Sequence, residues 1–397
     1  MSVRKRTWTT SRGVEKTAWV VDYIDVKGTR RLRTFAKKKD ADVFAATAAV
    51  EVREGVHVAD RDTVTVSKAG ALWIATGEAT ELERSTINQR RRHLKYHIEP
   101  FVGGTLLSKV TVPFIRSYED TLRAEGRSPA MIKKAVSSLG SIFADAQERG
   151  LATRNPVRDI RDRRRSDRRQ ERRQKRKLVV GEDIPTREEV KALIAALSGR
   201  WRPLLLTAIF AGLRSSELRG LRWQDIDLEA RALHVRQRAD EFGEIGRPKS
   251  EAGERTIPVP PIVVNALREW KLACPKGDLG LAFPNGAGKV ESHANIINRG
   301  LIPAMVAAGV SVDTGDIDME GKSVKAAKYS GLHTLRHFYA SWLINRQQDG
   351  GLGLPLKLVQ ERMGHSSITM TADVYGHLFP QTDDTEELAA AEAALLG

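Results

Sequence analysis

The sequence predicts an α+β protein with a small N-terminal domain of sheet plus helix, a second domain of helices, and a mainly helical third domain with a small β-sheet. Three patterns carry this prediction: alternating apolar residues at 17–26, apolar residues at helical spacing within 64–160, and a newly capped amphipathic helix at 183–197. A chain of 397 residues with 41% hydrophobic content is long enough to bury a separate core in each of two or three domains.

The first domain is assigned to residues 1–60. The stretch "TAWVVDYIDV" (17–26) alternates in the way a half-buried strand does, and "KGTRRLRTF" (27–35) reads as a turn followed by a second strand. The run at 37–55 has the composition of a helix that Gly55 closes. The residues expected on the buried face of the first strand are Trp19, Val21 and Tyr23.

The second domain, residues 64–160, has helical spacing throughout. "STINQRRRHLKYHIEPF" (85–101) forms one helix, with Ile87, Leu94 and Ile98 at helical spacing. A second helix follows at 128–150, where Ser128 is the N-cap, Pro129 occupies the first helical position and Gly150 ends the helix. Its buried stripe is Ile132, Val136, Leu139 and Phe143.

A basic linker, residues 161–180, separates the second domain from the third. Its run "RDRRRSDRRQERRQKRK" holds eleven Lys or Arg residues and three acidic ones. Such a run is either a solvated linker or a segment that follows phosphates and releases their counterions. The third domain, residues 181–380, opens on a capping box formed by Thr186 and Glu189.

The charge balance favours a polyanionic partner. Lys and Arg number 65 against 50 Asp and Glu, which gives a net charge of +15 and a pI near 9.9. The longest apolar run, at 203–213, is far shorter than the roughly 20 residues of a bilayer span. Cys274 is the only cysteine, which excludes an internal disulfide and a cysteine-based metal cluster, and a reducing cytoplasm fits best.

Six arginines are the predicted DNA contacts of the first two domains. They lie in two groups, one on the strands of the first domain and one on the first long helix of the second: Arg30, Arg31 and Arg33, and Arg90, Arg91 and Arg92. A charged strand edge also protects a sheet from aggregation, so a solvated edge is the alternative for the first group.

In the third domain, single cationic side chains occur within predicted helices and a predicted β-hairpin. Arg214 ends an apolar run in "FAGLRSSELRGLRWQDID" (210–227), where Glu217 is its expected salt-bridge partner. Lys249 lies in a predicted β-hairpin, a place where lysine is usually just exposed. His333 and Arg336 fall three apart on one helical face, and a shared phosphate would satisfy both donors.

The last candidates are His365 and Tyr375 in "MGHSSITMTADVY" (363–375). Taken alone, a helical tyrosine is usually a core residue and a lone histidine is usually structural. The order of all these residues along the chain resembles the tyrosine recombinases, specifically the phage-type integrases. Four segments carry the resemblance: "GLRSSELRGLRWQDID", the Lys249 hairpin, "HTLRH" and "MGHSSITMTADVY".

The resemblance implies a reaction and a role for each residue. Tyr375 would attack DNA and form a 3′-phosphotyrosyl intermediate, without metal or other cofactor. The remaining roles are charge neutralisation by Arg214 and Arg336, protonation of the leaving oxygen by Lys249, proton transfer by His333, a hydrogen bond to phosphate from His365, and orientation of the arginines by Glu217.

The resemblance also implies domain roles. It makes residues 1–60 an arm-type DNA-binding domain, 64–160 a core-binding domain, 181–380 the catalytic domain, and 381–397 a tail that packs into a neighbouring protomer. The short, acidic, alanine-rich tail cannot form a stable isolated helix, and docking on its own domain is the alternative. The sequence assigns no role to residues 311–330.

The function implied is integration or excision of a phage or mobile element. The partners are double-stranded attachment sites and three further copies in a tetramer on DNA, with room for an accessory DNA-bending or excision factor, and no membrane. The location is cytoplasmic, at the nucleoid. Three alternatives stay open: a resolvase or inversion recombinase, a non-catalytic DNA-binding regulator of the same fold, and a type IB topoisomerase, which would not need the two N-terminal DNA-reading domains.

Overall fold

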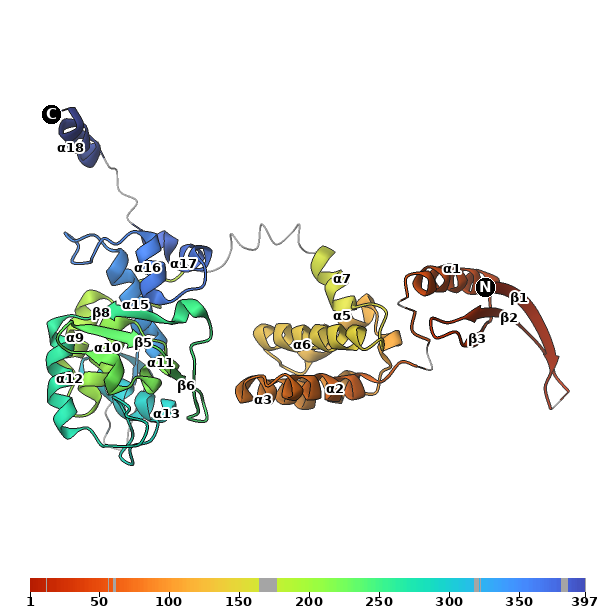
Figure 1. Ribbon diagram of the computed structural model, residues 1–397, viewed down its shortest axis with the longest axis horizontal. Coiled ribbons are helices and arrows are strands. Elements are labelled where there is room, and N and C mark those ends of the chain that lie inside the picture. The colour runs from red at the N-terminus through yellow and green to blue at the C-terminus, as the bar shows by residue number, and fades with distance from the viewer. Residues whose placement is uncertain are drawn as a thin grey trace. The chain divides into compact units, whose positions relative to one another are not determined.

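The computed structural model of the protein divides the chain into two compact units, Met1–Lys175 and Arg176–Gly397 (Figure 1). The residues that it describes are 1–11, 13–55, 57–59, 62–163, 177–317, 321, 323–379 and 385–396. Most of the predicted basic linker, from 164 to 176, therefore lies outside the described residues.

The first unit begins with a three-stranded antiparallel sheet in the order β1-β2-β3. Its strands are β1 (Ser2–Thr9), β2 (Glu15–Ile24) and β3 (Arg30–Phe35), and α1 (Lys38–Arg53) packs against them. Val21, Tyr23 and Ala41 form the centre of this small core, with Trp19 packed at its side. The sequence predictions for β2, β3 and α1 are confirmed. The strand β1 was not predicted, because its residues are almost all exposed and show no apolar alternation.

The rest of the first unit is helical, with a separate core. Its helices are α2 (Val66–Ala79), α3 (Arg84–His93), α4 (Glu99–Val102), α5 (Val112–Ala124), α6 (Pro129–Glu148) and α7 (Pro156–Arg163). The four residues of the predicted stripe of α6 are buried, and Ser128 caps this helix by accepting from the backbone N–H of Met131. A π-helical turn at Leu94–Ile98 joins α3 to α4, so the predicted helix over 85–101 is one helical run with a widened turn.

The second unit is mainly helical. Its helices are α9 (Arg187–Ala196), α10 (Trp201–Ala211), α11 (Ser215–Gly220), α12 (Pro261–Ala273), α13 (His293–Asn295), α14 (Ile302–Ala307), α15 (Leu332–Ile344), α16 (Leu356–Met363), α17 (Ile368–Tyr375) and α18 (Thr385–Leu396). The apolar helix α10 packs between α12 and α15 at the centre of one large core. The capping box of Thr186 and Glu189 is present at the start of α9, as predicted.

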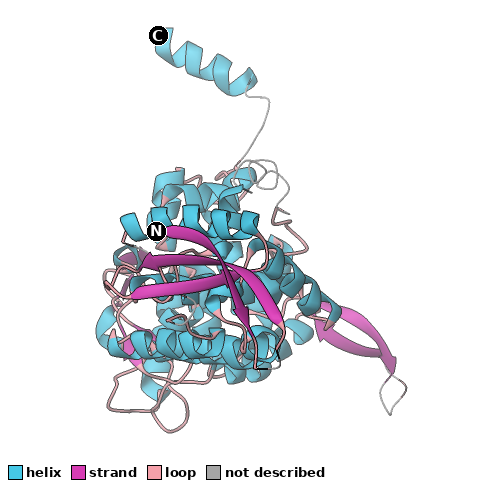
Figure 2. Cartoon of the chain, turned by 90° about the vertical axis from the view of Figure 1, so that its right-hand side faces the viewer, coloured by secondary structure: helices cyan, strands magenta, loops and turns pink. Residues whose placement is uncertain are grey.

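The described residues of the second unit also form three small sheets. The strands β4 (Ile226–Asp227), β5 (Ala232–Val235) and β8 (Arg255–Pro258) form an antiparallel sheet in that order, and β6 (Arg238–Ala239) pairs with β7 (Ile245–Gly246). The stretch 311–330, which has no role in the sequence prediction, contains the hairpin of β9 (Ser311–Ile317) and β10 (Ser323–Ala327). Figure 2 shows this hairpin projecting from the body of the unit.

Among the helices in the described part of the chain, none combines the length and the apolar character that crossing a bilayer would require.

Candidate active site

The site begins where α10 ends and α11 starts. Gly212 ends α10 in the left-handed region at φ 55°, and an added Cβ there would lie 2.2 Å from the Tyr339 ring. The chain then turns so that Arg214 is the N-cap of α11. Glu217 closes this first turn, because its carboxylate accepts from the Arg214 backbone N–H at 2.9 Å and from Arg214 Nη1 at 2.6 Å. The predicted Arg214–Glu217 salt bridge is therefore present, and it fixes the guanidinium.

A second arginine, Arg255 on β8, shares the same carboxylate. Its Nη2 donates to Glu217 Oε2 at 2.9 Å, and its Nε donates to the carbonyl of Arg362 at the end of α16 at 2.8 Å. Burial alone would raise the pKa of Glu217, but the positive charges of Arg255 and Arg214 and their hydrogen bonds outweigh it and lower this pKa. Arg255 thus ties β8, α11 and α16 together, a role that the sequence prediction missed.

Arg336, on α15, is the most deeply buried of the predicted cations, at 2% exposure. Its Nη1 donates to the carbonyl of Gly212 at 2.5 Å, and its Nη2 donates to the carbonyl of Met363. Arg214 Nη2 donates to the next carbonyl, that of Gly364, at 2.8 Å. The two predicted arginines therefore hold one turn of the chain, and His365 is the next residue in that turn.

His365 and Tyr375 face each other across this turn and α17. The His365 Nδ1 lies 3.0 Å from the Thr371 hydroxyl, and its ring is within 4° of parallel to the Tyr375 ring, with centroids 6.2 Å apart. Burial raises the pKa of Tyr375 to about 12, against the lowering effect of Arg336 and Arg214. Burial lowers the pKa of His365 to about 4, and the same two arginines add to this effect.

His333 is joined to Tyr375 by a residue that the sequence prediction did not assign. Its ring meets that of His337 edge to face, with centroids 4.5 Å apart, and His337 Nδ1 lies 2.8 Å from Tyr375 Oη. Partial desolvation lowers the pKa of His333, with contributions from Arg336 and Arg214. The missed signal was the spacing, since residues four apart lie on one helical face and His337 is four residues after His333.

Lys249 lies in the exposed loop that joins β7 to β8. The predicted hairpin is present, because β5 and β8 pair antiparallel, with His234 opposite Thr256. A lysine on such a loop has a long, mobile stem that can reach a bound substrate, and its catalytic role stays a prediction.

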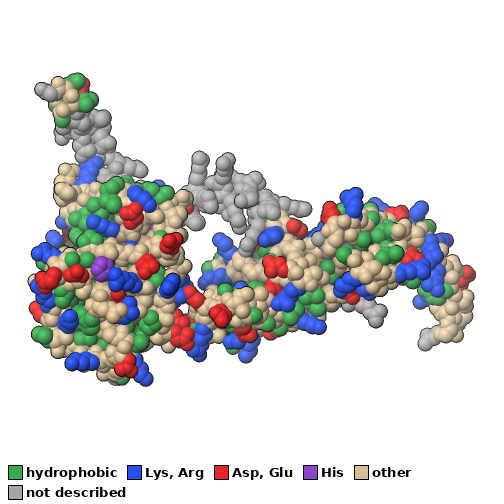
Figure 3. Space-filling view, in the orientation of Figure 1, with side chains coloured by type: hydrophobic (Ala, Val, Ile, Leu, Met, Phe, Trp, Pro, Cys, Tyr) green, Lys and Arg blue, Asp and Glu red, His purple; other side chains and the backbone are tan. Residues whose placement is uncertain are grey.

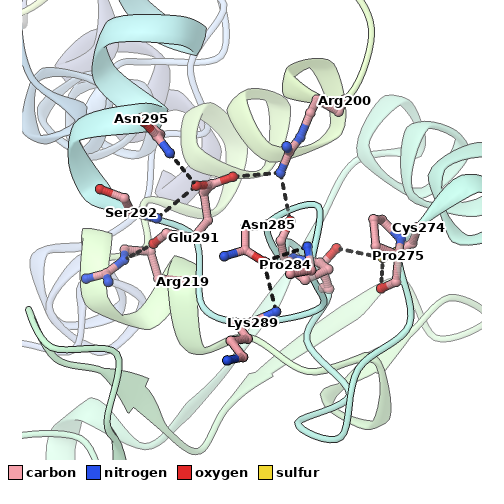
Figure 4. A network of polar contacts seen from close by, with 12 residues as sticks. Arg200, Arg219, Cys274, Pro275, Pro284, Asn285, Lys289, Glu291, Ser292 and Asn295 are labelled. Carbon is pink, nitrogen blue, oxygen red and sulfur yellow. Dashed lines mark hydrogen bonds and ion pairs between the residues drawn. The ribbon is translucent and has the colours of Figure 1, made fainter.

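A second polar network contacts α11 through Arg219 (Figure 4). The buried Arg219 donates from Nε to the Glu291 carbonyl at 2.6 Å and from Nη1 to the Asp240 carbonyl at 2.9 Å. The Glu291 carboxylate, itself 2% exposed, accepts from Arg200 Nη2 at 2.7 Å and from Asn295 at 3.1 Å. The short helix α11 is therefore held through Glu217, which bonds Arg214 and Arg255, and through Arg219. These contacts keep Arg214 and Arg255 in position.

The three guanidiniums of the site face only one carboxylate in the contacts described above. Clustered arginines with a single shared acid favour an anion, and the planar donors of guanidinium match the oxygens of a phosphate. Burial and the neighbouring Arg214 lower the pKa of Arg336 to about 10, so its charge is retained at neutral pH. Within the described residues, no three His, Cys, Asp or Glu side chains gather in a way that could hold a metal ion.

The arginines predicted to contact DNA in the first domain already have protein partners. Arg30 pairs with Asp22 at 2.5 Å, Arg31 bridges Asp25 and Asp62 at 2.7 Å each, and Arg33 lies 4.4 Å from the centroid of the Phe44 ring. Of these, Arg30 keeps the greater exposure, with 69% of its side chain accessible against 19% for Arg31.

The three arginines of α3 also differ from one another. Arg90 stacks on Trp73 at 4.4 Å and donates to its carbonyl at 2.9 Å, whereas Arg91 pairs with Glu78 and Arg92 is exposed. On the face shown in Figure 3, Lys and Arg side chains are spread over both units among acidic ones. The DNA contacts stay predictions, and Arg90 and Arg31 have clear structural roles besides.

Comparison with known proteins shows which family the chain resembles. The sequence model of the phage integrase family matches residues 185–382. A tyrosine recombinase from Thermosipho africanus is 30% identical over 64% of this chain and 75% of its own length. A XerC-like tyrosine recombinase from Caldanaerobacter subterraneus subsp. tengcongensis is 26% identical over 87% of each chain.

Solved structures show the same fold. The integrase of the Tn1549 transposon, solved with transposon right-end DNA, superposes with a TM-score of 0.61 at 20% identity and covers 83% of this chain and 100% of its own. The lambda integrase, solved as a tetramer bound to a Holliday junction, gives a TM-score of 0.52 at 17% identity and covers 91% of this chain and 96% of its own.

Proposed function

Because the chain belongs to the phage integrase family of tyrosine recombinases, whose members cut and rejoin DNA, we propose that it recombines the attachment sites of a phage or other mobile element. The observation that carries the proposal is the convergence of Arg214, Arg336 and His365 on one turn of the chain, beside the hydroxyl-bearing Tyr375. This convergence joins segments more than a hundred residues apart in the sequence, and their chemistry fits a phosphodiester.

In the proposed reaction, Tyr375 Oη attacks the scissile phosphorus and the 5′-oxygen leaves. The product is a 3′-phosphotyrosyl link that conserves the energy of the phosphodiester, so strands rejoin without ATP. Arg214 and Arg336 stabilise the negative charge on the non-bridging oxygens. Lys249 protonates the 5′-oxygen as general acid, and His365 donates a hydrogen bond to a non-bridging oxygen. Glu217 keeps Arg214 in position, and His333 assists proton transfer.

The proposal extends to the domains. Residues 1–60 read arm sites, 64–160 bind the core site with the catalytic domain 181–380, the linker 161–180 follows phosphates, and 381–397 join neighbouring protomers in a tetramer on DNA. The small sheet domain, with its own core of Val21, Tyr23 and Ala41, favours integration over resolution or inversion, because a separate arm reader suits the control of integration. An accessory DNA-bending or excision factor fits the same scheme.

The test traps the covalent intermediate. Duplex fragments of the DNA that flanks the gene, carrying nicks at random positions, are incubated with the protein, because a nick near the crossover point lets the short strand diffuse away and prevents rejoining. We expect a protein–DNA adduct that survives denaturation and whose trapped sequence identifies the core site. The Tyr375→Phe variant should bind the same DNA and form no adduct.

An adduct formed by Tyr375→Phe would exclude Tyr375 as the nucleophile. Tight binding to a specific site with no adduct from the wild-type protein would instead favour the non-catalytic DNA-binding regulator.

A further inference from the structure

Among the described residues, the side chain within hydrogen-bond distance of the attacking atom is His337, to which the proposed mechanism assigns no role. His337 lies on α15 and Tyr375 at the end of α17, and the distance from His337 Nδ1 to Tyr375 Oη is 2.8 Å. The two rings meet edge to face, with centroids 5.7 Å apart. The His333 ring packs against the His337 ring, with centroids 4.5 Å apart. Geometry therefore gives His337, ahead of His333, the position to receive a proton from Oη.

The surroundings of this contact fix the imidazole. Tyr375 is 2% exposed, and His337 is half-buried between the tyrosine and His333. The charged or titratable groups that act on the imidazole come from three places. They are His333 and Arg336 on the same helix, Tyr375 on α17, and Asp183 in the loop before α9.

The protonation states of the pair suit a transfer from oxygen to nitrogen. Burial raises the pKa of Tyr375 to about 12, so the hydroxyl keeps its hydrogen at neutral pH. Burial lowers the pKa of His337 to about 4, with further lowering by His333 and Arg336, so the imidazole is neutral. With its hydrogen on Nε2, a neutral imidazole offers Nδ1 as the acceptor for the phenol. Asp183 acts in the opposite direction and favours an imidazolium once one forms.

We propose that His337 is a catalytic residue, the general base that takes the Tyr375 hydroxyl proton on Nδ1 as Oη attacks the scissile phosphorus. The electron pair of the O–H bond forms the Oη–P bond. The pair of the P–O5′ bond leaves with the 5′-oxygen, which takes its proton from Lys249. In the rejoining step the imidazolium returns its proton to Oη. The inference rests on the proposed function and adds the acceptor of the proton to it.

Two substitutions separate proton uptake from positioning. In His337→Asn the side-chain oxygen can still accept the tyrosine hydrogen bond near the place of Nδ1, but an amide cannot take a proton. His337→Ala removes both properties. His234→Ala is the control, because His234 lies on β5 with Nδ1 2.9 Å from the Thr256 hydroxyl, outside the site. The rate of adduct formation is measured for the full-length proteins in single turnovers on the nicked core site, from pH 6 to pH 9.

We expect both variants to bind the core site as the wild type does and to form adduct roughly 10²-fold more slowly at pH 7. Their rates should rise about tenfold per pH unit, because hydroxide must then ionise a phenol whose pKa is far above this range. The wild-type rate should vary little, since His337 is already neutral, and the control should follow the wild type.

Four results would overturn the inference. Wild-type speed in His337→Asn would mean that the contact only positions the tyrosine. Faster cleavage by His337→Ala would mean that His337 restrains the nucleophile, and a slow variant with the pH profile of the wild type would rule out a lost base. Absence of adduct from all proteins, the wild type included, would overturn the proposed function and this inference together.

Discussion

Glu217 and Arg255 form an ion pair of 2.9 Å inside the second unit, with only 3% and 6% of their side chains exposed. A buried pair of this kind contributes little net stability compared with a well-packed apolar pair, but removal of one partner leaves the other buried charge with less compensation. The pair also connects α11 to β8, two elements that carry or flank proposed catalytic residues. Its integrity should therefore affect both folding and cleavage.

Replacement of Arg255 by Met should destabilise the protein by up to about 3–5 kcal/mol, because Glu217 would lose its more buried counter-charge and keep only the half-exposed Arg214. The measurement is urea unfolding followed by circular dichroism. Arg268→Met is the matched control, since Arg268 pairs with Glu229 at 2.8 Å at the surface, where an ion pair contributes at most about 1 kcal/mol. Equal effects of the two substitutions would contradict a structural role for the buried pair.

The acid sensitivity of the protein should depend on Glu217. Its pKa in the folded protein is lowered, so the unfolded chain binds a proton at this residue more readily than the folded one. The resulting stabilisation is complete above the ordinary glutamate pKa of about 4.3 and is lost as pH falls through the lower folded value. The slope of stability against pH below about 5 should thus be shallower in Glu217→Gln than in the wild type, and Glu229→Gln should keep the wild-type slope.

The two proposed phosphate-binding arginines should behave differently when removed. Arg214→Ala and Arg336→Ala should each slow adduct formation by roughly 10²-fold or more, by analogy with the loss of an oxyanion donor. Arg336 is 2% exposed and holds two backbone carbonyls, so its loss should also lower the urea midpoint, whereas the Arg214 side chain is 36% exposed and should cost less stability. Near-normal cleavage by either variant would make that arginine purely structural.

Lys249→Ala should slow cleavage of ordinary DNA and recover on a substrate whose 5′-bridging oxygen is replaced by sulfur. A thiolate leaves without protonation, so a missing general acid no longer limits the rate. Arg214→Ala serves as the comparison, because loss of charge stabilisation at the non-bridging oxygens should not be rescued by sulfur. If Lys249→Ala stays as slow on the sulfur substrate, Lys249 is not the general acid.

Sequence reasoning predicted the elements whose signals are local. The capping box at Thr186 and the Ser128 cap depend on residues three apart, and both are present. The strand β1 has a polar, exposed sequence, and its pairing with β2 is all that defines it. The hairpin of β9 and β10 escaped prediction for the same reason, because its residues are mostly polar and exposed.

The candidate site divides in the same way. The order of residue types along the chain predicted Arg214, Arg336 and Tyr375 as site residues. Arg255 and His337 became visible only in three dimensions, because each acts through a residue distant in sequence: Arg255 through Glu217, and His337 through Tyr375. His337 lies four residues after His333 and therefore on the same helical face, but this spacing does not predict a contact with Tyr375.

The C-terminal tail ends in an exposed helix. The helix α18, at Thr385–Leu396, has twelve residues, a length at which an isolated helix is marginal in water. Leu395 and Leu396 are 84% and 76% exposed, so the helix presents apolar side chains that a partner could cover. Because we propose that this partner is the neighbouring protomer, deletion of residues 382–397 should leave half-site binding by one protomer intact and weaken assembly of the tetramer. Gel-shift titrations on half-sites and full sites measure the two steps separately.

A milder change tests the same contact without shortening the chain. The double variant Leu395→Ser, Leu396→Ser should weaken tetramer assembly almost as much as the deletion, because the substitutions remove the apolar surface and keep the length of the chain. The double variant Ala393→Ser, Ala394→Ser is the control, since it changes the same helix and keeps both leucines. If the tail docks on its own domain instead, the leucine variant will lower the urea midpoint of the free protein and leave assembly unchanged. Exchange between protomers requires the opposite result, a normal midpoint with impaired assembly, because a contact between copies adds nothing to the stability of one copy alone.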